Sequence, residues 1–411
     1  MSTADQNLIS QYHQVIIIGS GTAGLSAAYQ LHKSGVKSVI ILEGSKRIGG
    51  RILTEYLDEN LSKPLEMGAC WMHGLQGNPV YELAQRENFP AHTGTILNFD
   101  IGTCVDENGL YISSELHHEV DQFFDSLLQD TRDLFEFQQI NNTQLSSSSI
   151  HKVFLEKFEN FLNSNAGDNG TRSLKLKLLQ RRFDQETGEC GCQSMEQVSY
   201  SEFGSYQRPK GPDMEFPSGY STLIRYLFSQ IPQDWILFEQ FVENILWDTD
   251  KHVKITCANG NIYECEQLIC TIPLAVMKWS YKSLFTPALP AWKSEAIQKM
   301  DMGTVDKIYL FYDKIDFFTG SYSYVPVGAS SCQHIRDLAE PLKVQDKSRV
   351  HFAGEHTHTR FYSTVTGAFI TGQAQALEII QELNTKNDTE MLVKANTDDF
   401  NKMQWKREEP P

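Results

Sequence analysis

An apolar, β-branched run at residues 15–18 leads directly into three glycines between residues 19 and 24. Such a run predicts a strand that is buried on both faces. Residues 23–34 have the pattern of a helix, a second buried strand is predicted at residues 39–42, and Glu43 closes it. A strand, a glycine turn, a helix and a strand that ends in an acid predict a dinucleotide-binding unit.

The glycines and the acid each have a physical task in such a unit. Gly19 permits the tight turn, Gly21 lets a pyrophosphate approach the backbone, and Gly24 lets helix and strand pack closely. The helix N-terminus stabilises the phosphates, and Glu43 is placed to accept hydrogen bonds from the adenosine ribose. The alternative, a glycine turn without a ligand, is less consistent with the strand, helix and acid around it.

Two further loops carry groups that suit a site for a flat, phosphorylated ligand. Gly49, Gly50 and Arg51 come after the second strand, where a cation can pair with phosphate. In residues 65–74, small residues surround a carboxylate, an indole and the imidazole of His73, so backbone can lie close to a ring. The alternatives are a solvated arginine and an ordinary surface or core histidine.

The charge and the cysteines limit the classes of partner. A net charge of −16 argues against nucleic acid or an anionic membrane and suits a cationic small molecule. The eight cysteines are scattered, so we expect reduced thiols and no metal site. We find no signal-peptide pattern, no apolar run long enough to cross a membrane and no peroxisomal C-terminal tripeptide, and therefore expect a cytoplasmic chain.

Patterns elsewhere in the chain predict a helical insertion and more strands. Apolar stripes at helical spacing predict helices over about residues 115–140 and 153–162. Lys307 stands at the head of an apolar stretch that predicts a strand. The other predicted strands lie at residues 242–247, 252–257, 262–265, 268–273 and 350–355, and the last of these leads towards a helix over about residues 368–383.

Together these residues resemble the flavin-dependent amine oxidases, most closely the branch of acetylpolyamine and spermine oxidases. The shared motifs appear in the family's order over about residues 14–380. They are the glycines from Gly19 to Gly24, Glu43, Gly49-Gly50-Arg51, Glu66-x-Gly-Ala-x-Trp-x-His73-Gly74, FPSGY from Phe216, CTIPL from Cys270, MGTVDKI ending at Ile308, GSYSYV from Gly320 and FAGE from Phe352.

The resemblance implies an α/β fold in which a Rossmann-like FAD domain is interwoven with an α+β substrate domain. The FAD domain would contain residues 10–80, 206–272 and 346–385. The substrate domain would contain residues 81–205, mostly helical, and residues 273–345, shortened near 313–320. Residues 386–411 would be a polar tail.

The resemblance also implies FAD as the cofactor, held non-covalently because histidines rather than a cysteine follow Glu355. Arg51 would lie near the phosphates, and Val242 would contact the adenine end through its backbone. Glu355 would hold the ribityl or pyrophosphate part, and Thr364 would lie near the flavin ring. The full implied set is Gly19, Gly21, Gly24, Glu43, Gly50, Arg51, Val242, Gly354, Glu355, Thr364 and Val365.

Four residues match catalytic positions of the family. Lys307 matches the lysine that holds a water against flavin N5, and His73 matches the polyamine-branch histidine near the substrate. Tyr324 would form one wall of the box around the substrate amine, with Thr364 opposite.

The implied reaction is the oxidation of spermine or of N1-acetylated spermine or spermidine. The α-carbon gives a hydride to flavin N5, the imine is hydrolysed to an aldehyde and a shorter amine, and O2 becomes hydrogen peroxide. The polyamine and O2 would be the partners, nucleic acid and membrane would not, and we expect a monomer.

The family's pattern is interrupted between Lys307 and Tyr324. Only residues 313–319 stand where the family has several strands, a helix and an aromatic residue over the flavin. These residues could span about 25 Å when extended, but the sheet beneath the cavity is missing, so we expect an open or incomplete substrate cavity. Two alternatives to an oxidase stay open: a shortened, non-catalytic chain that keeps the FAD-binding fold, and a different dinucleotide-linked dehydrogenase.

Overall fold

The first predicted strand lies inside the main sheet. In the computed structural model of the chain, β1 (Gln11–Ile18) pairs in parallel with β2 (Val39–Leu42) on one side and β10 (Ile262–Cys270) on the other. Its apolar residues 15–17 are fully buried. Burial on both faces by a parallel sheet is what the apolar run predicts.

The structure describes residues 11–56, 64–89, 92–93, 105–106, 111–141, 143, 148–164, 168–249, 251–309, 323–326, 328–345 and 347–386. The chain divides into two compact units. The first unit contains Met1–Gly94, Arg208–Ile297 and Arg336–Pro411, and the second contains Thr95–Gln207 and Gln298–Ile335.

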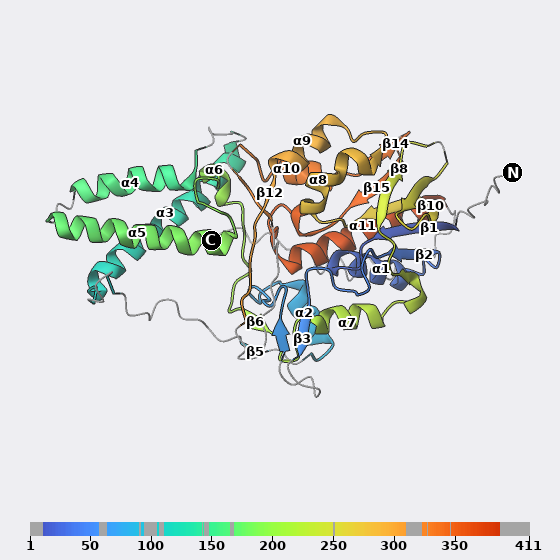
Figure 1. The fold of residues 1–411 in the computed structure, drawn as a ribbon, viewed down its shortest axis with the longest axis horizontal. Helices are drawn as coiled ribbons and strands as arrows, with labels where there is room; N and C mark the ends of the chain where they lie inside the picture. The colour runs from blue at the N-terminus through green and yellow to red at the C-terminus, as the bar shows by residue number, and fades with distance from the viewer. Residues whose placement is uncertain are drawn as a thin grey trace, which may run out of the picture. The chain divides into compact units, whose positions relative to one another are not determined.

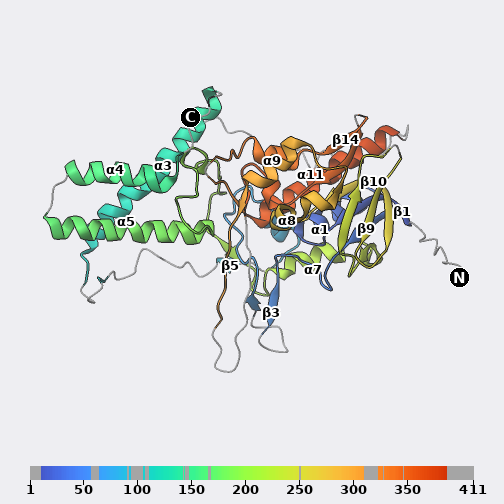
Figure 2. The ribbon, with the colours of Figure 1, turned by 45° about the horizontal axis from the view of Figure 1, so that its top comes forward.

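The first unit is built on a nine-stranded sheet (Figure 1). Its parallel part has the order β7-β2-β1-β10-β15, and β8 and β9 extend it as an antiparallel meander, shown in Figure 2 beside β10. The prediction of separate strands at residues 262–265 and 268–273 was wrong, because β10 is continuous. Its first half alternates between half-buried and buried positions, and its second half is fully buried, so one strand has two sequence patterns.

The other elements of the first unit follow in chain order. They are α1 (Thr22–Lys33), β3 (Thr54–Tyr56), β4 (Pro64–Glu66), α2 (Pro79–Arg86), β5 (His92–Thr93), β6 (Met214–Glu215), α7 (Ser221–Ser229), η2 (Gln233–Trp235), β7 (Ile236–Leu237), β8 (Val242–Leu246), β9 (Val253–Cys257), α8 (Leu274–Leu284), β11 (Phe285–Thr286), α9 (Ala291–Lys299), β14 (Leu342–Val344), β15 (Lys347–Phe352), η3 (Glu355–Thr357) and α11 (Val365–Lys386). The last residues of α9 and the helix α10 (His334–Ala339) cross the boundaries between the two units.

Helices α1 and α11 pack against each other at very short range. The Ser26 hydroxyl donates a hydrogen bond of 2.9 Å to the Phe369 carbonyl, and a Cβ on Gly372 would lie 2.0 Å from the Ala23 carbonyl oxygen. A larger residue at position 372 would therefore prevent α11 from packing this closely on α1.

The second unit contains a group of long helices (Figure 1). Helices α3 (Ser114–Asn141), α4 (Ile150–Ser164) and α5 (Asn169–Cys190) enclose an apolar cluster rich in phenylalanine. The predicted stripes at residues 115–140 and 153–162 form α3 and α4. The unit also contains α6 (Tyr200–Phe203), β12 (Asp301–Met302) and β13 (Ser323–Tyr324).

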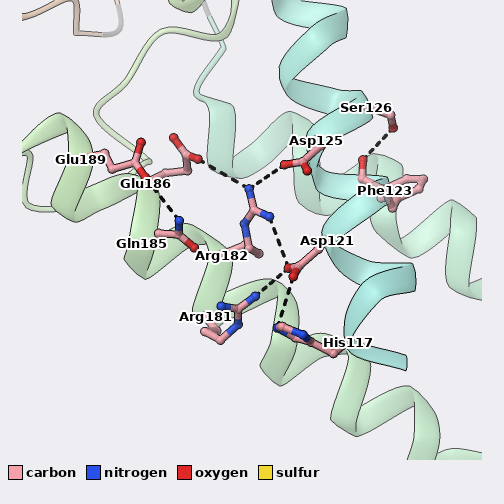
Figure 3. Close-up of polar contacts among 10 residues, drawn as sticks. All are labelled: His117, Asp121, Phe123, Asp125, Ser126, Arg181, Arg182, Gln185, Glu186 and Glu189. Atoms are coloured by element: carbon pink, nitrogen blue, oxygen red, sulfur yellow. Dashed lines mark hydrogen bonds and ion pairs between the residues drawn. The ribbon is translucent and has the colours of Figure 1, made fainter. Parts of the chain in front are cut away.

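An ion-pair network connects α3 to α5 (Figure 3). Asp121 lies 2.6 Å from a nitrogen of Arg181 and 3.3 Å from a nitrogen of Arg182, and Asp125 lies 2.7 Å from Arg182. On the same helix Glu186 lies 3.8 Å from Arg182. Burial raises the pKa of Glu186 to about 7, and the neighbouring Glu189 adds to this rise.

These elements confirm the predicted α/β class with a Rossmann-like sheet. Within the part of the chain that the structure describes, no helix has the length and apolar character needed to cross a membrane.

Candidate active site

The turn after β1 has the geometry that its glycines predict. Gly19 has a φ of +97°, a left-handed conformation that favours glycine. A Cβ on Gly24 would lie 1.9 Å from the Gly19 carbonyl oxygen, so only glycine lets α1 start this close to the strand. Gly21 is the N-cap of α1 and provides no side-chain cap for the first N–H groups of the helix. This helix end therefore suits an anion.

The predicted arginine loop lies against this turn. The Gly49 N–H donates to the Ser20 carbonyl at 2.9 Å, and a Cβ on Gly50 would lie 3.3 Å from the Gly21 Cα. The guanidinium of Arg47 donates to the Gly50 carbonyl at 2.8 Å and so holds the loop in place. Two backbones without side chains therefore face each other beside the N-terminus of α1.

Glu43 lies at the end of β2, where its carboxylate accepts three hydrogen bonds. The N–H and hydroxyl of Ser20 donate at 2.8 and 2.7 Å, and the N–H of Ser45 donates at 2.8 Å. Burial acts to raise the pKa of Glu43, but these hydrogen bonds outweigh it and lower the pKa. The group is an ionised acceptor beside the glycine turn, as a ribose ligand requires.

The segment before Val242 runs along Glu43. The Glu43 N–H donates to the Leu237 carbonyl at 2.9 Å, and the Gln240 N–H donates to the Glu43 carbonyl at 2.8 Å. Val242 is buried at the start of β8. Its contact with adenine stays a prediction, and this placement brings its segment beside Glu43.

Arg51 and Glu355 form an ion pair between two distant segments of the chain. The two side chains are 2.9 Å apart, and only 6% of the Glu355 side chain is exposed against 34% for Arg51. The other Glu355 oxygen accepts from the Ser363 N–H at 2.7 Å, and Ser363 has a φ of +69°. Residues that the sequence places near the pyrophosphate thus lie together.

Glu355 lies between a glycine and a buried, uncharged histidine in the sequence. Gly354 accepts no Cβ, since that atom would lie 2.7 Å from the ring of His356. The imidazole of His356 is buried, and burial lowers its pKa to about 4. The ring is therefore neutral near pH 7 beside the ionic pair of Arg51 and Glu355.

Thr364 caps helix α11. Its hydroxyl accepts from the Gly367 N–H at 3.0 Å and donates to the Phe361 carbonyl at 2.7 Å. The helix begins at Val365, earlier than the predicted residue 368, because this cap satisfies its first turn. The hydroxyl is thus engaged with backbone, and the place of Thr364 opposite Tyr324 stays a prediction.

His73 has an acidic partner that sequence reasoning missed. Its Nδ1 lies 3.2 Å from Asp213, which also accepts from the Gly74 N–H at 3.2 Å and lies 2.6 Å from Arg208. Burial acts to raise the pKa of Asp213, but His73 and Arg208 outweigh it and lower the pKa to about 2. An acid shortly before the FPSGY motif was the signal available in the sequence.

Lys307 and Tyr324 belong to the second unit, whereas the other predicted site residues belong to the first. Lys307 is half-buried, and β12 ends at Met302. Residues 303–309 are not in a strand, and residues 310–312 of the predicted strand lie outside the described residues. Tyr324 lies in β13 and pairs with Asp301, and its side chain lies outside the described residues. Residues 313–319 also lie outside them. The meeting of Lys307 and Tyr324 at a flavin stays a prediction.

Comparison with known proteins decides the family. Residues 22–317 and 314–380 match the flavin containing amine oxidoreductases. The chain belongs to this family. The two matched stretches meet at residues 314–317, the place where the sequence predicts a missing segment.

Several relatives of this member of the family are named as polyamine enzymes. The bovine peroxisomal N(1)-acetyl-spermine/spermidine oxidase is 30% identical over 352 residues, which cover 80% of this chain and 65% of the relative. The human enzyme of the same name is 29% identical, over 73% of the chain and 62% of the relative. A probable polyamine oxidase 5 of Arabidopsis thaliana is 27% identical, over 72% of the chain and 61% of the relative. The chain thus spans less than two thirds of the length of these relatives.

The cofactor of the family is FAD, held non-covalently, and the residues of the first unit fit it. The uncapped N-terminus of α1, the bare backbones of Gly21 and Gly50 and the guanidinium of Arg51 suit a pyrophosphate. The ionised Glu43 suits a ribose. The structure describes no group of three His, Cys, Asp or Glu side chains that could hold a metal ion in the ranges given above.

Proposed function

We propose that this chain is an FAD-dependent oxidase of polyamines, acting on spermine or on N1-acetylated spermine or spermidine. The observation that supports it most is the similarity to oxidases named for N(1)-acetyl-spermine and spermidine, at 30% identity over most of the chain. The fit of the first unit to FAD supports the redox part. The net charge of −16 favours a cationic substrate.

Bound FAD would accept a hydride from the α-carbon of the amine at N5 and pass the electrons to O2, which yields hydrogen peroxide. In this proposal Glu43 holds the ribose, and Gly21, Gly50 and Arg51 hold the phosphates. The Arg51–Glu355 pair keeps the buried carboxylate compensated, which fixes the loop against the N-terminus of α1.

His73 would bind the substrate. Because the ionised Asp213 can only accept hydrogen bonds, Nδ1 of His73 carries the proton that faces it. In the neutral ring Nε2 is then an acceptor, which suits a protonated amine of a polyamine. We propose that Lys307 holds a water for flavin reoxidation and that Tyr324 and Thr364 border the reacting amine.

The test is to purify the chain, record its flavin absorbance, and add N1-acetylspermine, N1-acetylspermidine or spermine without oxygen. The proposal expects bleaching of the flavin and, with oxygen restored, release of peroxide. His73→Ala should raise KM by roughly tenfold to 100-fold, by loss of a hydrogen bond to a charged group. The exposed His118→Ala on α3 should leave the kinetics unchanged. Bound flavin that none of these amines reduces would reject the proposed activity.

A second candidate is a chain that binds FAD but does not oxidise amines. The observation that favours it is the meeting of the two family matches at residues 314–317, together with coverage of 65% of the bovine relative. Unreduced flavin in the same assay is its expected result. The family match weighs against the other alternative, a different dinucleotide-linked dehydrogenase.

The domain boundaries, a monomeric state and a cytoplasmic location also belong to this proposal. Limited proteolysis, light scattering of the purified chain and imaging of a tagged chain test them in turn.

A further inference from the structure

Two cysteines flank the turn that ends helix α5. Cys190 is the last residue of the helix, and Gly191 follows in a left-handed conformation with a φ of 65°. The Gly191 N–H donates to the Gly188 carbonyl at 3.2 Å, so the chain folds back at this point. Two Cα–Cα steps of about 3.8 Å that bend at a glycine bring Cys190 and Cys192 inside the roughly 7 Å limit for a disulfide.

The side chain of Cys192 folds back over the end of the same helix. Its Sγ lies 3.9 Å from the carbonyl oxygen of Thr187 and 4.0 Å from Sδ of Met195. Cys192 is 8% exposed, and Cys190 is half-buried. The two thiols therefore lie at the same helix end, where Cys192 is mostly buried and Cys190 is partly exposed.

The surroundings make the two thiols unequal. A hydrogen bond between the two side chains raises the pKa of Cys190 and lowers that of Cys192. Burial and the nearby Glu186 and Glu189 raise the pKa of Cys190 further. Burial also acts to raise the pKa of Cys192, but the hydrogen bond from Cys190 and the N–H of Ser194 outweigh it. Cys192 is thus the better nucleophile, and Cys190 is its protonated neighbour.

We infer that Cys190 and Cys192 form a redox-active dithiol that hydrogen peroxide converts to a disulfide. Sγ of Cys192 attacks one peroxide oxygen, so an S–O bond forms, the O–O bond breaks and water leaves after protonation. Sγ of Cys190 then attacks the sulfenic sulfur, so the S–S bond forms and a second water leaves. The two thiols lose two electrons and two protons, and the peroxide gains both.

The oxidised turn would act on the segment that leads to Lys307. The Thr304 N–H donates to the Gly191 carbonyl at 2.7 Å. A Cβ on Gly303 would lie 2.9 Å from the carbonyl oxygens of both Cys190 and Gly191, so the two backbones are in close contact. Closing the disulfide changes the geometry of this turn and therefore the support of residues 303–307. If the proposed oxidase activity holds, its own product would regulate it in this way.

The first test uses the purified, reduced chain after removal of reductant. Peroxide is added, free thiols are alkylated, and peptides are analysed by mass spectrometry. The peptide with Cys190 and Cys192 should lose two hydrogens and resist alkylation until dithiothreitol is added. It should react at least about tenfold faster than Cys257, a thiol whose pKa burial raises to about 11. Full alkylation of both cysteines after peroxide, or a rate equal to that of Cys257, would overturn the inference.

Two variants separate the roles of the thiols. In Cys190→Ser, Cys192 should stop at the sulfenic acid, which dimedone traps. In Cys192→Ser, Cys190 should stay a thiol under the same peroxide, and equal oxidation of both variants would overturn the assignment. The variant Cys257→Ser is the matched control and should form the disulfide like the unmodified chain.

The second test measures hydrogen exchange in peptides that cover residues 303–309. Oxidation should change their exchange rate at least about twofold in the unmodified chain and not in Cys192→Ser. Unchanged exchange would overturn the connection to Lys307. Because the peroxide is added, these results do not depend on turnover: an inactive chain can form the disulfide, and an active chain can lack it.

Discussion

The glycine contacts of α1 in the first unit and the α3–α5 contact in the second unit hold their elements together in different ways. In the first unit, backbone approaches backbone: a Cβ on Gly24 or Gly372 would lie 1.9 or 2.0 Å from a carbonyl oxygen. In the second unit, charged side chains cross between helices, as Asp121 and Arg182 do. Contacts made by backbone leave no room for substitution, whereas an ion pair at a helix surface can be replaced. The glycine contacts of α1 should therefore tolerate less change than the α3–α5 contact.

The largest expected effect comes from a methyl group at Gly24. Gly24→Ala should abolish FAD binding and lower the free energy of unfolding by at least about 3 kcal/mol, because strand and helix must move apart. The matched change is Gly188→Ala in α5, where an added Cβ meets nothing within 4 Å. It should stabilise the second unit by about 0.5–1 kcal/mol. Flavin absorbance measures FAD binding of the two variants, and thermal unfolding measures their stability. Normal FAD binding by Gly24→Ala would contradict the expected difference between the two glycines.

The second largest expected effect is that acid lowers the free energy of unfolding of the first unit. Burial lowers the pKa of His351, His356 and His358 to about 4 each, from an ordinary value of 6.5. Their stabilising contribution is therefore present above pH 6.5 and is lost as the pH falls towards 4. Each histidine can lower the free energy of unfolding by up to about 1.4 kcal/mol per pH unit between pH 6.5 and pH 4.

Urea unfolding at pH 7 and pH 5, followed by hydrogen exchange in peptides of the first unit, measures this loss. His356→Phe removes one titrating ring and should make the dependence on pH less steep. Identical unfolding at the two pH values would show that these rings are not buried as neutral groups.

Removing the Arg51–Glu355 pair should have a smaller effect, which is measured as a loss of affinity for the cofactor. Arg51→Ala removes a cation from the predicted phosphate site and leaves a buried carboxylate without this partner. The Kd for FAD should rise by roughly tenfold to 100-fold. Arg86→Ala is the control, because Arg86 pairs with Glu87 at the surface and such pairs contribute little. Flavin fluorescence titration compares the two, and equal affinities would place the phosphates elsewhere.

Glu186 in the second unit should give the smallest effect, with the opposite dependence on pH. Its pKa of about 7 lies above the ordinary 4.5, so its contribution is full below pH 4.5 and is lost as the pH rises through 7. Glu186→Gln should raise the free energy of unfolding by about 1 kcal/mol at pH 8 and leave it unchanged at pH 4. Hydrogen exchange in α5 measures this difference in the free energy of unfolding. Equal effects of the substitution at both pH values would contradict the raised pKa of Glu186.

The glycine turn and its flanking strands and helix could be predicted from sequence, because the residues that form them are adjacent in the chain and few residue types fit their geometry. The run from β1 to Glu43 is continuous, and steric limits at Gly19 and Gly24 permit few alternatives. Pairs between distant residues were not accessible in this way. Nothing in the sequence near His73 shows that Asp213 will face it, because a separate segment of the chain supplies that carboxylate.

Helix α5 was not predicted, and the reason is physical. Three of its buried residues, Lys175, Arg182 and Glu186, are charged, so the buried face has no continuous apolar stripe. Lys175 and Arg182 are tolerated there because α3 provides the opposite charges, and Glu186 lies 3.8 Å from Arg182 on its own helix. At residues 303–309 the pattern that begins at Lys307 forms no strand. An apolar pattern alone does not show whether neighbouring strands are in place to pair with it.

The ion pair of Arg51 with Glu355 joins residues 304 positions apart, and α11 packs on α1 beyond it. During synthesis, the site at the N-terminal glycine turn is therefore complete only after Glu355 and the first turns of α11 have been added. The nascent protein passes through this period without the stabilisation that a bound ligand gives. Bound flavin can therefore stabilise the folded first unit only after residues 355–369 have joined the chain.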